Sequence, residues 1–416
     1  MTRKPLAEVI GAVLGAPIAV EAYDGSQHGP EDAKVRMVLR SPKALSYLVT
    51  APGQLGFARA YVAGELDLIG DVYTALSLLW GNHIASLTWA GRLDLVRNLD
   101  PAALRWVGPP AEEYGARRLR HGLRHSKARD AEVISHHYDV SNRFYELVLG
   151  PSMTYTCACY PTDDATLEEA QASKYDLVCR KLDLQPGMRL LDVGCGWGGM
   201  VQHAAKHYGV KALGVTLSQR QAEWGARSIA DAGLGDLAEV RHSDYRDVTE
   251  SDFDAVSSIG LTEHVGLKNL PSYFQFLGSR LRPGGRLLNH CITRPTTTEP
   301  TKSEGFIDRY VFPDGELEGA GTIISAMQDN GFEVRHEENL REHYARTLAG
   351  WSANLEAQWD EAVREAGEGR CRVWQLYMAG CRLGFERRTI ELHQVLGVRT
   401  GSDGESGFPL RPTWGS

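Results

Sequence analysis

The sequence predicts an α/β fold in which a doubly wound, mostly parallel sheet is joined to a smaller N-terminal α+β domain. Two observations support this prediction. From about Asp130 onward, short apolar runs alternate with helical stretches, which is the pattern of a parallel sheet covered by helices. Within that region a glycine-rich turn joins the apolar run Met188–Val193 to the helical stretch Met200–Tyr208, as at a ligand-binding strand–turn–helix unit.

Five apolar runs are expected to form the parallel strands: Met188–Val193, Lys211–Val215, Ala238–His242, Phe253–Ile259 and Arg286–Cys291. Late strands are expected around Glu333–Arg335 and Thr389–Gly397. Residues 303–365 interrupt the alternation, and we expect them to form a helical insertion over the active site. The ligand crevice of such a sheet lies at the carboxyl ends of its strands.

The chain divides into four segments: an N-terminal domain (1–110), a basic linker (111–130), the sheet domain (131–400) and a mobile tail (401–416). In the first domain, Val35–Leu39 is strand-like, and the pattern from Pro42 through Leu79 is helical. Three prolines between Asn98 and Pro110 mark its end. The tail is rich in Gly, Ser and Pro, a composition typical of mobile ends.

Composition excludes several classes of protein. A net charge of −8 argues against nucleic acid as a partner. No run of 18 apolar residues occurs, so we expect no transmembrane segment, and no signal peptide is recognised. The seven cysteines are odd in number and lack framework spacing, which favours reduced thiols in the cytoplasm. Cys157 and Cys159 have no second pair at zinc-ligand spacing, so we expect no metal site.

The linker carries six basic residues within 13 positions, from Arg117 to Arg129. Such a run is typical of a solvated helix face or linker. It is also compatible with contact to anionic lipid headgroups, which contributes about 1 kcal/mol per basic residue near the surface. Both interpretations stay open at the level of sequence.

The glycine turn predicts a site for a nucleotide-like cofactor. Gly194, Gly196 and Gly199 satisfy G-x-G-x-x-G, in which glycine lets the backbone approach a ligand at a helix N-terminus. A dinucleotide site usually has an acidic residue at the end of the next strand. Here that strand ends at Thr216, without a carboxylate, so an NAD(P)-dependent oxidoreductase is disfavoured.

Polar side chains follow several of the predicted strands. Glu263 comes directly after the fourth strand, and His290 and Ile292 close the fifth. Cys157 lies upstream of the first strand, and Tyr344 lies in the C-terminal part. Taken singly, each also fits a structural role: a hydrogen-bonded histidine, a packed cysteine or a solvated acidic loop.

The turn Asp192–Gly199 resembles the first motif of class I S-adenosylmethionine (SAM) methyltransferases, and Leu281–Leu288 resembles their fifth-strand turn. Over nearly the whole chain the sequence is similar to the cyclopropane-fatty-acyl-phospholipid synthases, which include the mycolic acid cyclopropane synthases and related lipid methyltransferases. Five motifs match in order: His137-Tyr-Asp-Val-Ser-Asn142, Met153-Thr-Tyr-Thr-Cys-Ala158, Val193-Gly-Cys-Gly-Trp-Gly-Gly199, Gly214-Val-Thr-Leu-Ser218 and Glu263-His-Val-Gly266. The segment Gly56–Asp67 is similar to the N-terminal domain of the longer bacterial synthases.

The resemblance implies methylene transfer from SAM to the double bond of an unsaturated phospholipid acyl chain. The alkene attacks the SAM methyl, a base removes a proton from the resulting carbocation, and the cyclopropane ring closes. The family uses bound bicarbonate as this base. The matching catalytic contacts are Cys157, Glu263, His290, Ile292 (through its backbone) and Tyr344.

The resemblance also implies the cofactor site. Its SAM contacts carry over to Tyr138, Tyr155, Thr156, Gly194, Gly196, Thr216 and Gln221. Thr216 and Gln221 would take over part of the ribose recognition for which a strand-end acid is missing. Asp244 and Tyr245 would flank the adenine.

One departure concerns the segment after the base-site histidine. The family often reads His-Thr-Ile-Gly there, whereas this chain reads His290-Cys-Ile-Thr-Arg294. Two alternatives therefore accompany the cyclopropane product: a methyltransferase that yields a 10-methylene chain, and a catalytically inactive lipid-binding protein. The implied location is cytoplasmic and peripheral to the membrane, where phospholipid acyl chains are the partner, and a homodimer is left open.

Overall fold

The computed structural model describes residues 4–51, 53–80, 105–113, 140–298, 305–313 and 315–414. The chain forms two compact units. One contains residues 1–120, 304–313 and 355–383, and the other contains residues 121–303, 314–354 and 384–416. The basic run from Arg117 to Arg129 lies outside the described residues. A solvated linker and a lipid-contacting segment therefore both remain predictions.

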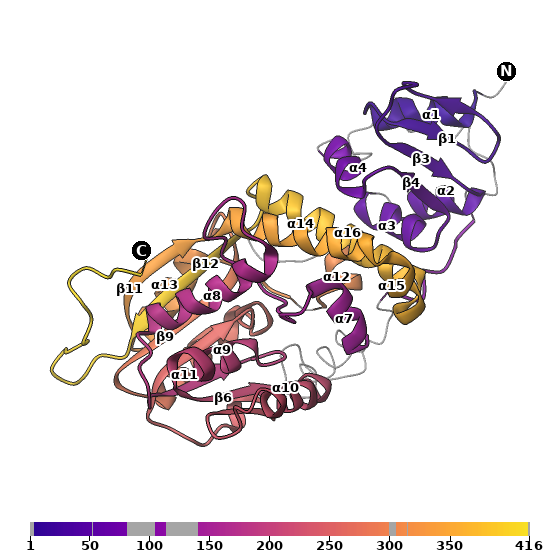
Figure 1. The fold of residues 1–416 in the computed structure, drawn as a ribbon. Coiled ribbons are helices and arrows are strands. Elements are labelled where there is room, and N and C mark those ends of the chain that lie inside the picture. The colour runs from indigo at the N-terminus through magenta and orange to yellow at the C-terminus, as the bar shows by residue number, and fades with distance from the viewer. Residues whose placement is uncertain are drawn as a thin grey trace. The chain divides into compact units, whose positions relative to one another are not determined.

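The first unit holds a small four-stranded sheet with strand order β2-β1-β3-β4 (Figure 1). Its N-terminal elements are α1 (Leu6–Leu14), β1 (Ala19–Glu21), β2 (Gln27–His28), β3 (Arg36–Leu39), α2 (Pro42–Thr50), α3 (Gln54–Val62), β4 (Leu66–Ile69) and α4 (Val72–Leu79). Farther along the chain the unit gains α12 (Phe306–Tyr310), α15 (Trp359–Ala366) and most of α16 (Glu368–Glu386).

The strand predicted at Val35–Leu39 is confirmed as β3, but the helical reading of Pro42 through Leu79 is wrong in one place. Strand β4 interrupts it and pairs antiparallel with β3. Gly64 has a φ of +71°, which lets the chain turn back after α3 ends. A four-residue strand between two helices is too short to disturb the helical periodicity of the sequence.

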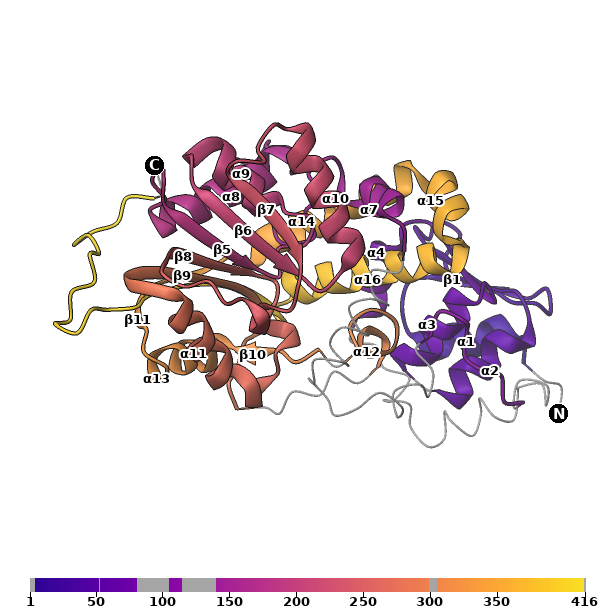
Figure 2. The ribbon, with the colours of Figure 1, turned by 90° about the horizontal axis from the view of Figure 1, so that it is seen from below.

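The second unit contains an eight-stranded sheet with strand order β11-β12-β9-β8-β5-β6-β7, and β10 pairs with β9 outside this path (Figure 2). Its strands are β5 (Arg189–Val193), β6 (Lys211–Thr216), β7 (Ala238–His242), β8 (Phe253–Ile259), β9 (Leu281–Arg294), β10 (Glu318–Gly319), β11 (Glu333–Asn339) and β12 (Glu391–Val398). Strands β9, β8, β5, β6 and β7 run parallel, whereas β12 is antiparallel to both β9 and β11. The predicted doubly wound, mostly parallel sheet is thus confirmed, with β9 and β11 longer than expected.

Helices cover both faces of this sheet (Figure 2). In the described part of this unit the helices are α7 (Asn142–Leu149), α8 (Leu167–Leu182), α9 (Gly199–Tyr208), α10 (Gln219–Asp231), α11 (Leu270–Arg280), α13 (Ala320–Asp329) and most of α14 (Arg341–Ala357), with short 3-10 turns η4 (Tyr245–Asp247), η5 (Thr262–His264) and η6 (Leu267–Asn269). The segment predicted as a helical insertion, 303–365, contains α12, α13, α14 and α15. It also supplies β10 and β11 to the sheet, so only part of it departs from the alternating pattern.

Successive residues of each strand face opposite sides of the sheet, and this alternation builds two cores. Leu288 and Leu396 lie in the core beneath α8 and α9. Their neighbours Leu287 and Val395 lie in the core beneath α11 and α13. By the same alternation, His290 lies on the α8 face of β9.

The C-terminal residues 401–414 contain no helix or strand. Phe408 and Trp414 nevertheless pack against the core on the α8 face, and their rings meet edge to face. Two aromatic side chains therefore hold this segment to the sheet. Among the described residues, no helix is long and apolar enough to cross a membrane, and no group of three or more potential metal ligands occurs.

Candidate active site

The glycine turn between β5 and α9 has the conformation that a ligand cradle requires. Gly194 and Gly196 have φ angles of +72° and +55°, in the left-handed region that favours glycine. A Cβ at Gly196 would meet no atom within 4 Å and would project into open space. At Gly199, by contrast, a Cβ would collide with the Tyr175 hydroxyl, so that glycine is required for packing.

A cavity opens over this turn at the carboxyl ends of β5 and β8. It is lined by Met153, Thr154, Tyr155, Thr156, Lys174, Tyr175, Asp192, Gly194, Cys195, Gly196, Trp197, Gly199, Met200, Gln221, Ile259 and Gly260. Five of the predicted cofactor contacts are in this lining: Tyr155, Thr156, Gly194, Gly196 and Gln221. Tyr138 lies outside the described residues.

Three polar residues, Thr216, Ser218 and Gln221, lie at the end of β6 and just after it, where a ribose-binding acid would stand. The Thr216 hydroxyl donates to Gln221 Oε1 at 2.7 Å and accepts the backbone N–H of Ser218 at 3.2 Å. All three side chains are buried. Because its oxygen is engaged by Thr216, Gln221 has its amide N–H₂ group to offer toward the cavity.

Asp244 and Tyr245 lie at the carboxyl end of β7, but neither is among the residues that line the cavity. Asp244 caps η4 and binds the Arg246 side chain. The Tyr245 ring packs edge to face against Tyr273 and Phe276. Their proposed place beside adenine rests on the family resemblance alone.

Two buried ionisable residues of the cavity were not predicted from the sequence. Lys174 on α8 donates to the Thr156 hydroxyl at 2.9 Å, and Asp192 on β5 accepts the Ser257 hydroxyl at 2.6 Å. Burial lowers the pKa of Lys174 to about 7 and raises the pKa of Asp192 to about 7. Asp192 lies two residues before Gly194, so its place beside the glycine turn could have predicted a position in the cavity. Nothing in the sequence around Lys174 predicts its place there.

Glu263 binds the part of β9 that extends beyond the end of β8. Strand β8 ends at Ile259, which pairs with His290 of β9, and the Gly260 N–H donates to the His290 carbonyl at 2.8 Å. Two residues farther along β9, the Ile292 N–H has no strand partner on that side and donates to Glu263 Oε1 at 2.7 Å. Burial raises the pKa of Glu263 to about 7, although this hydrogen bond acts in the opposite direction.

His290 is fully buried between the neighbouring strands. Its Nδ1 lies 3.1 Å from the amide nitrogen of Gln394, which pairs with it across the β9–β12 ladder. Gln394 Oε1 in turn accepts from the buried ammonium of Lys181 at 2.7 Å. Burial, followed by the positive charges of Lys174 and Lys181, lowers the pKa of His290 well below its usual range, so the ring is neutral at pH 7.

Cys157 and the backbone of Tyr344 share a contact at the start of α14. The Cys157 Sγ lies 3.1 Å from the Ala158 carbonyl and 3.8 Å from the Leu340 carbonyl, and the Tyr344 backbone N–H donates to the Leu340 carbonyl at 3.2 Å. The Leu340 N–H donates to the carbonyl of Leu392, the β12 partner of Ile292. Burial raises the pKa of the Cys157 thiol well above its usual range, so this thiol is a neutral donor.

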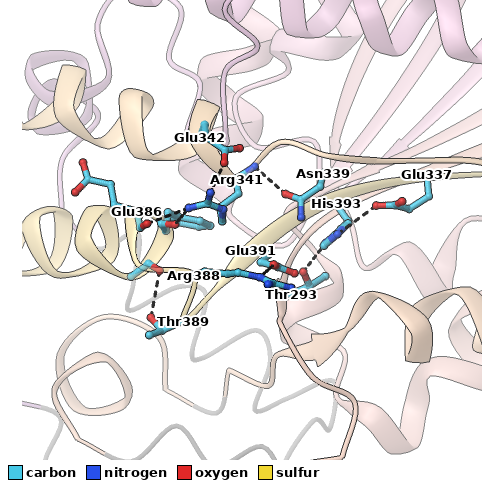
Figure 3. A network of polar contacts seen from close by, with 12 residues as sticks. Thr293, Glu337, Asn339, Arg341, Glu342, Glu386, Arg388, Thr389, Glu391 and His393 are labelled. Carbon is cyan, nitrogen blue, oxygen red and sulfur yellow. Dashed lines mark hydrogen bonds and ion pairs between the residues drawn. The ribbon is translucent and has the colours of Figure 1, made fainter. Parts of the chain in front are cut away.

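The start of α14 is anchored by the network in Figure 3. The Arg341 guanidinium donates to the backbone carbonyls of Phe385 and Glu386 at the end of α16. The Tyr344 ring stacks on Phe385 with 4.6 Å between ring centroids. Arg341 therefore fixes the helix turn that carries Tyr344.

Two polar atoms at this edge of the sheet are buried and have no hydrogen-bond partner within the described part of the chain: Glu263 Oε2 and His290 Nε2. Buried polar atoms normally have a hydrogen-bond partner. Two such atoms at strand ends that lack a partner therefore indicate a site for a ligand. A carboxylate oxygen accepts and a neutral imidazole N–H donates, which fits an anion that carries one proton, such as hydrogen carbonate. The open space at Gly196, together with Gln221, fits a nucleoside such as that of SAM.

The contacts connect the five predicted catalytic residues into one neighbourhood. Glu263 binds the Ile292 backbone, and Ile292 lies two residues from His290. Leu340 and Leu392 join Ile292 to the start of α14, where Cys157 and Tyr344 lie. Four residues of the cavity and its surroundings were not predicted from the sequence: Lys174, Asp192, Lys181 and Gln394.

Comparison with known proteins gives a consistent result. The family model described as mycolic acid cyclopropane synthetase matches residues 125–395. A probable fatty acid methyltransferase of Mycobacterium tuberculosis is 53% identical over 414 residues, which cover 98% of this chain and 97% of that protein.

Two further relatives each match about two thirds of the chain. The cyclopropane-fatty-acyl-phospholipid synthase of Escherichia coli is 35% identical over 279 residues, 66% of this chain and 71% of that protein. The solved structure of the mycolic acid cyclopropane synthase CmaA1, complexed with SAH and CTAB, is 34% identical with a TM-score of 0.60, covering 64% of this chain and 97% of that one.

Proposed function

Because the chain belongs to the mycolic acid cyclopropane synthetase family and is a SAM-dependent methyltransferase, we propose that it converts double bonds of unsaturated phospholipid acyl chains into cyclopropane rings. SAM, when bound, supplies an electrophilic methyl group. Cys157, Glu263, His290, the Ile292 backbone and Tyr344 would hold hydrogen carbonate, which would supply a base for removal of the proton before ring closure.

The observation that carries this proposal is the pair of unpartnered buried atoms, Glu263 Oε2 and His290 Nε2. His290 neighbours the cavity through its backbone, because Ile259 and Gly260 line the cavity and also pair with His290. Glu263 follows Gly260 by three residues, in η5. A bare anion would be repelled by Glu263, whereas the hydroxyl of hydrogen carbonate donates to it in a charge-assisted hydrogen bond. An inactive lipid-binding protein would gain nothing from two such costly groups.

The cofactor contacts proposed are Tyr138, Tyr155, Thr156, Gly194, Gly196, Thr216 and Gln221, with Asp244 and Tyr245 near the adenine. The burial of Cys157, Glu263 and His290 suits a reaction through a carbocation, since water would trap that species as an alcohol. An alkene is a weak nucleophile, so orientation of the acyl chain against the methyl group supplies much of the acceleration.

We further propose that the protein works at the cytoplasmic membrane surface as a peripheral protein, with the N-terminal domain (1–110) assisting substrate presentation. The basic linker is the segment expected to contact anionic headgroups. Sedimentation with anionic vesicles tests this: binding should weaken as salt rises, because screening shortens the reach of surface charge. Equal binding to neutral and anionic vesicles at all salt concentrations would contradict it.

The product distinguishes the proposed reaction from its neighbour. The protein is incubated with SAM and vesicles of monounsaturated phospholipid, and the extracted acyl chains are analysed by mass spectrometry and NMR. Cyclopropane protons support the proposal. A 10-methylene chain has the same mass and would instead assign the alternative, for which the departure after His290 is the supporting observation.

A further inference from the structure

Lys181 is a charged residue buried completely beneath the sheet. Its side chain is fully inaccessible, and it forms an ion pair with Glu338 of β11. An ammonium group has three donors and no acceptor. The Gln394 amide therefore must turn its oxygen toward Lys181, as the 2.7 Å contact between Nζ and Oε1 shows.

This orientation decides which nitrogen of His290 carries the proton. With its oxygen engaged by Lys181, Gln394 directs its N–H₂ group at His290 Nδ1, 3.1 Å away. An amide N–H can only donate, so Nδ1 must be the acceptor of this bond. In a neutral imidazole the other nitrogen, Nε2, then carries the hydrogen.

We infer that Lys181 and Gln394 are positioning residues that hold His290 as the Nε2–H tautomer and so present a hydrogen-bond donor to the anion site. This inference rests on the proposed function, since the anion is the hydrogen carbonate proposed above. We call the chain of hydrogen bonds from Lys181 through Gln394 to His290 the relay. It starts on α8 and reaches the site through β12, which pairs Gln394 directly with His290. Without it, the two tautomers would compete, and one of them would turn a lone pair toward the anion.

The tautomer of the wild-type protein is the first test, and it needs no activity. Long-range ¹H–¹⁵N NMR of protein labelled with ¹⁵N-histidine reports which ring nitrogen is protonated. The chain has 14 histidines, so the His290→Asn variant identifies the His290 signals. We expect a protonated Nε2 and a bare Nδ1 at pH 8. A protonated Nδ1 would overturn the inference.

A second test replaces the Gln394 amide, which donates to His290, by a carboxylate. In Gln394→Glu the carboxylate can only accept, from Lys181 on one side and from His290 on the other. We expect the neutral ring to switch to the Nδ1–H tautomer, which leaves Nε2 as an acceptor. The hydrogen carbonate concentration for half-maximal activity should then rise at least about tenfold, as for loss of one hydrogen bond to a charged group. Gln202→Glu is the matched control: Gln202 lies on α9, and its oxygen accepts from Ser228, which a carboxylate also permits.

The ring protonation of His290 and the hydrogen carbonate dependence are tested separately. If the tautomer is as inferred but wild-type activity is indifferent to hydrogen carbonate in degassed buffer, the proposed base is wrong and the relay stands. If activity depends on hydrogen carbonate but Gln394→Glu leaves both the ring protonation and that dependence as in Gln202→Glu, the relay is wrong.

Discussion

Replacing Glu263 by glutamine changes one atom of the site and leaves its frame in place. The glutamine oxygen can still accept the Ile292 N–H, which lies 2.7 Å from Oε1 in the native protein. The unpartnered Oε2 becomes an N–H₂ group, so the acceptor for the hydrogen carbonate hydroxyl becomes a donor. We expect turnover to fall by about 100- to 10,000-fold, the usual range for loss of general-base catalysis, because hydrogen carbonate would lose the group that orients it as the base.

The same substitution should stabilise the protein at alkaline pH. The pKa of Glu263 is raised from 4.5 to about 7 by burial, so folding is penalised when the carboxyl is ionised. This penalty is absent below pH 4.5 and complete above pH 7, where it amounts to at most about 3 kcal/mol. Denaturant unfolding at pH 5 and pH 8 should therefore show a gain for Glu263→Gln only at pH 8.

Three measurements decide this prediction: turnover with phospholipid vesicles, SAM affinity by calorimetry, and unfolding at the two pH values. Glu239→Gln on β7 is the matched control, an exposed carboxylate paired with Arg241 on the surface. SAM affinity should be unchanged in both variants, since Glu263 does not line the cavity within the described residues. Near-native turnover would remove Glu263 from the mechanism, and a parallel loss of SAM affinity would assign it a structural role instead.

Three further predictions follow from the site and its surroundings. At constant hydrogen carbonate concentration, kcat/KM should rise with pH through about 7, because Glu263 must be ionised to accept the hydrogen bond from the hydroxyl of hydrogen carbonate; a rise centred near its ordinary pKa of 4.5 would contradict this. Gly196→Ala should weaken SAM binding about tenfold by placing a Cβ in the cofactor space, whereas Gly233→Ala, which has a similar φ of +67° and open surroundings, should leave calorimetric affinity unchanged. Phe408→Ala should lower the free energy of unfolding by about 1 kcal/mol through lost packing, whereas Leu410→Ala, whose side chain is fully exposed, should not; equal thermal stabilities would contradict anchoring of the tail.

The sheet domain was predictable because its signals are local. Buried parallel strands appear in the sequence as short apolar runs. The glycine turn after β5 is by itself typical of a ligand-binding site. The strand ends also indicated which polar residues belong to the site, since Glu263 follows β8 and His290 lies near the end of β9. Strand β4 was missed because its four residues fit the helical pattern on either side.

The relay was not predictable from local pattern. Arg180 and Lys181 stand at the end of a helix, where basic residues are common and normally solvated. Gln394 lies in an apolar run about 100 residues from His290, and only the antiparallel pairing of β12 with β9 brings the two together. Such a contact depends on strand order, which sequence periodicity does not encode.

The central claim is that this site makes cyclopropane rings with hydrogen carbonate as the base. The most direct measurement is NMR and mass spectrometry of phospholipid acyl chains after incubation with SAM, in degassed buffer and in buffer restored with hydrogen carbonate. The account predicts cyclopropane chains that form at full rate only when hydrogen carbonate is restored, and that are nearly absent with Glu263→Gln. Ring formation at an unchanged rate in degassed buffer, or an acyl product without a ring, would contradict it.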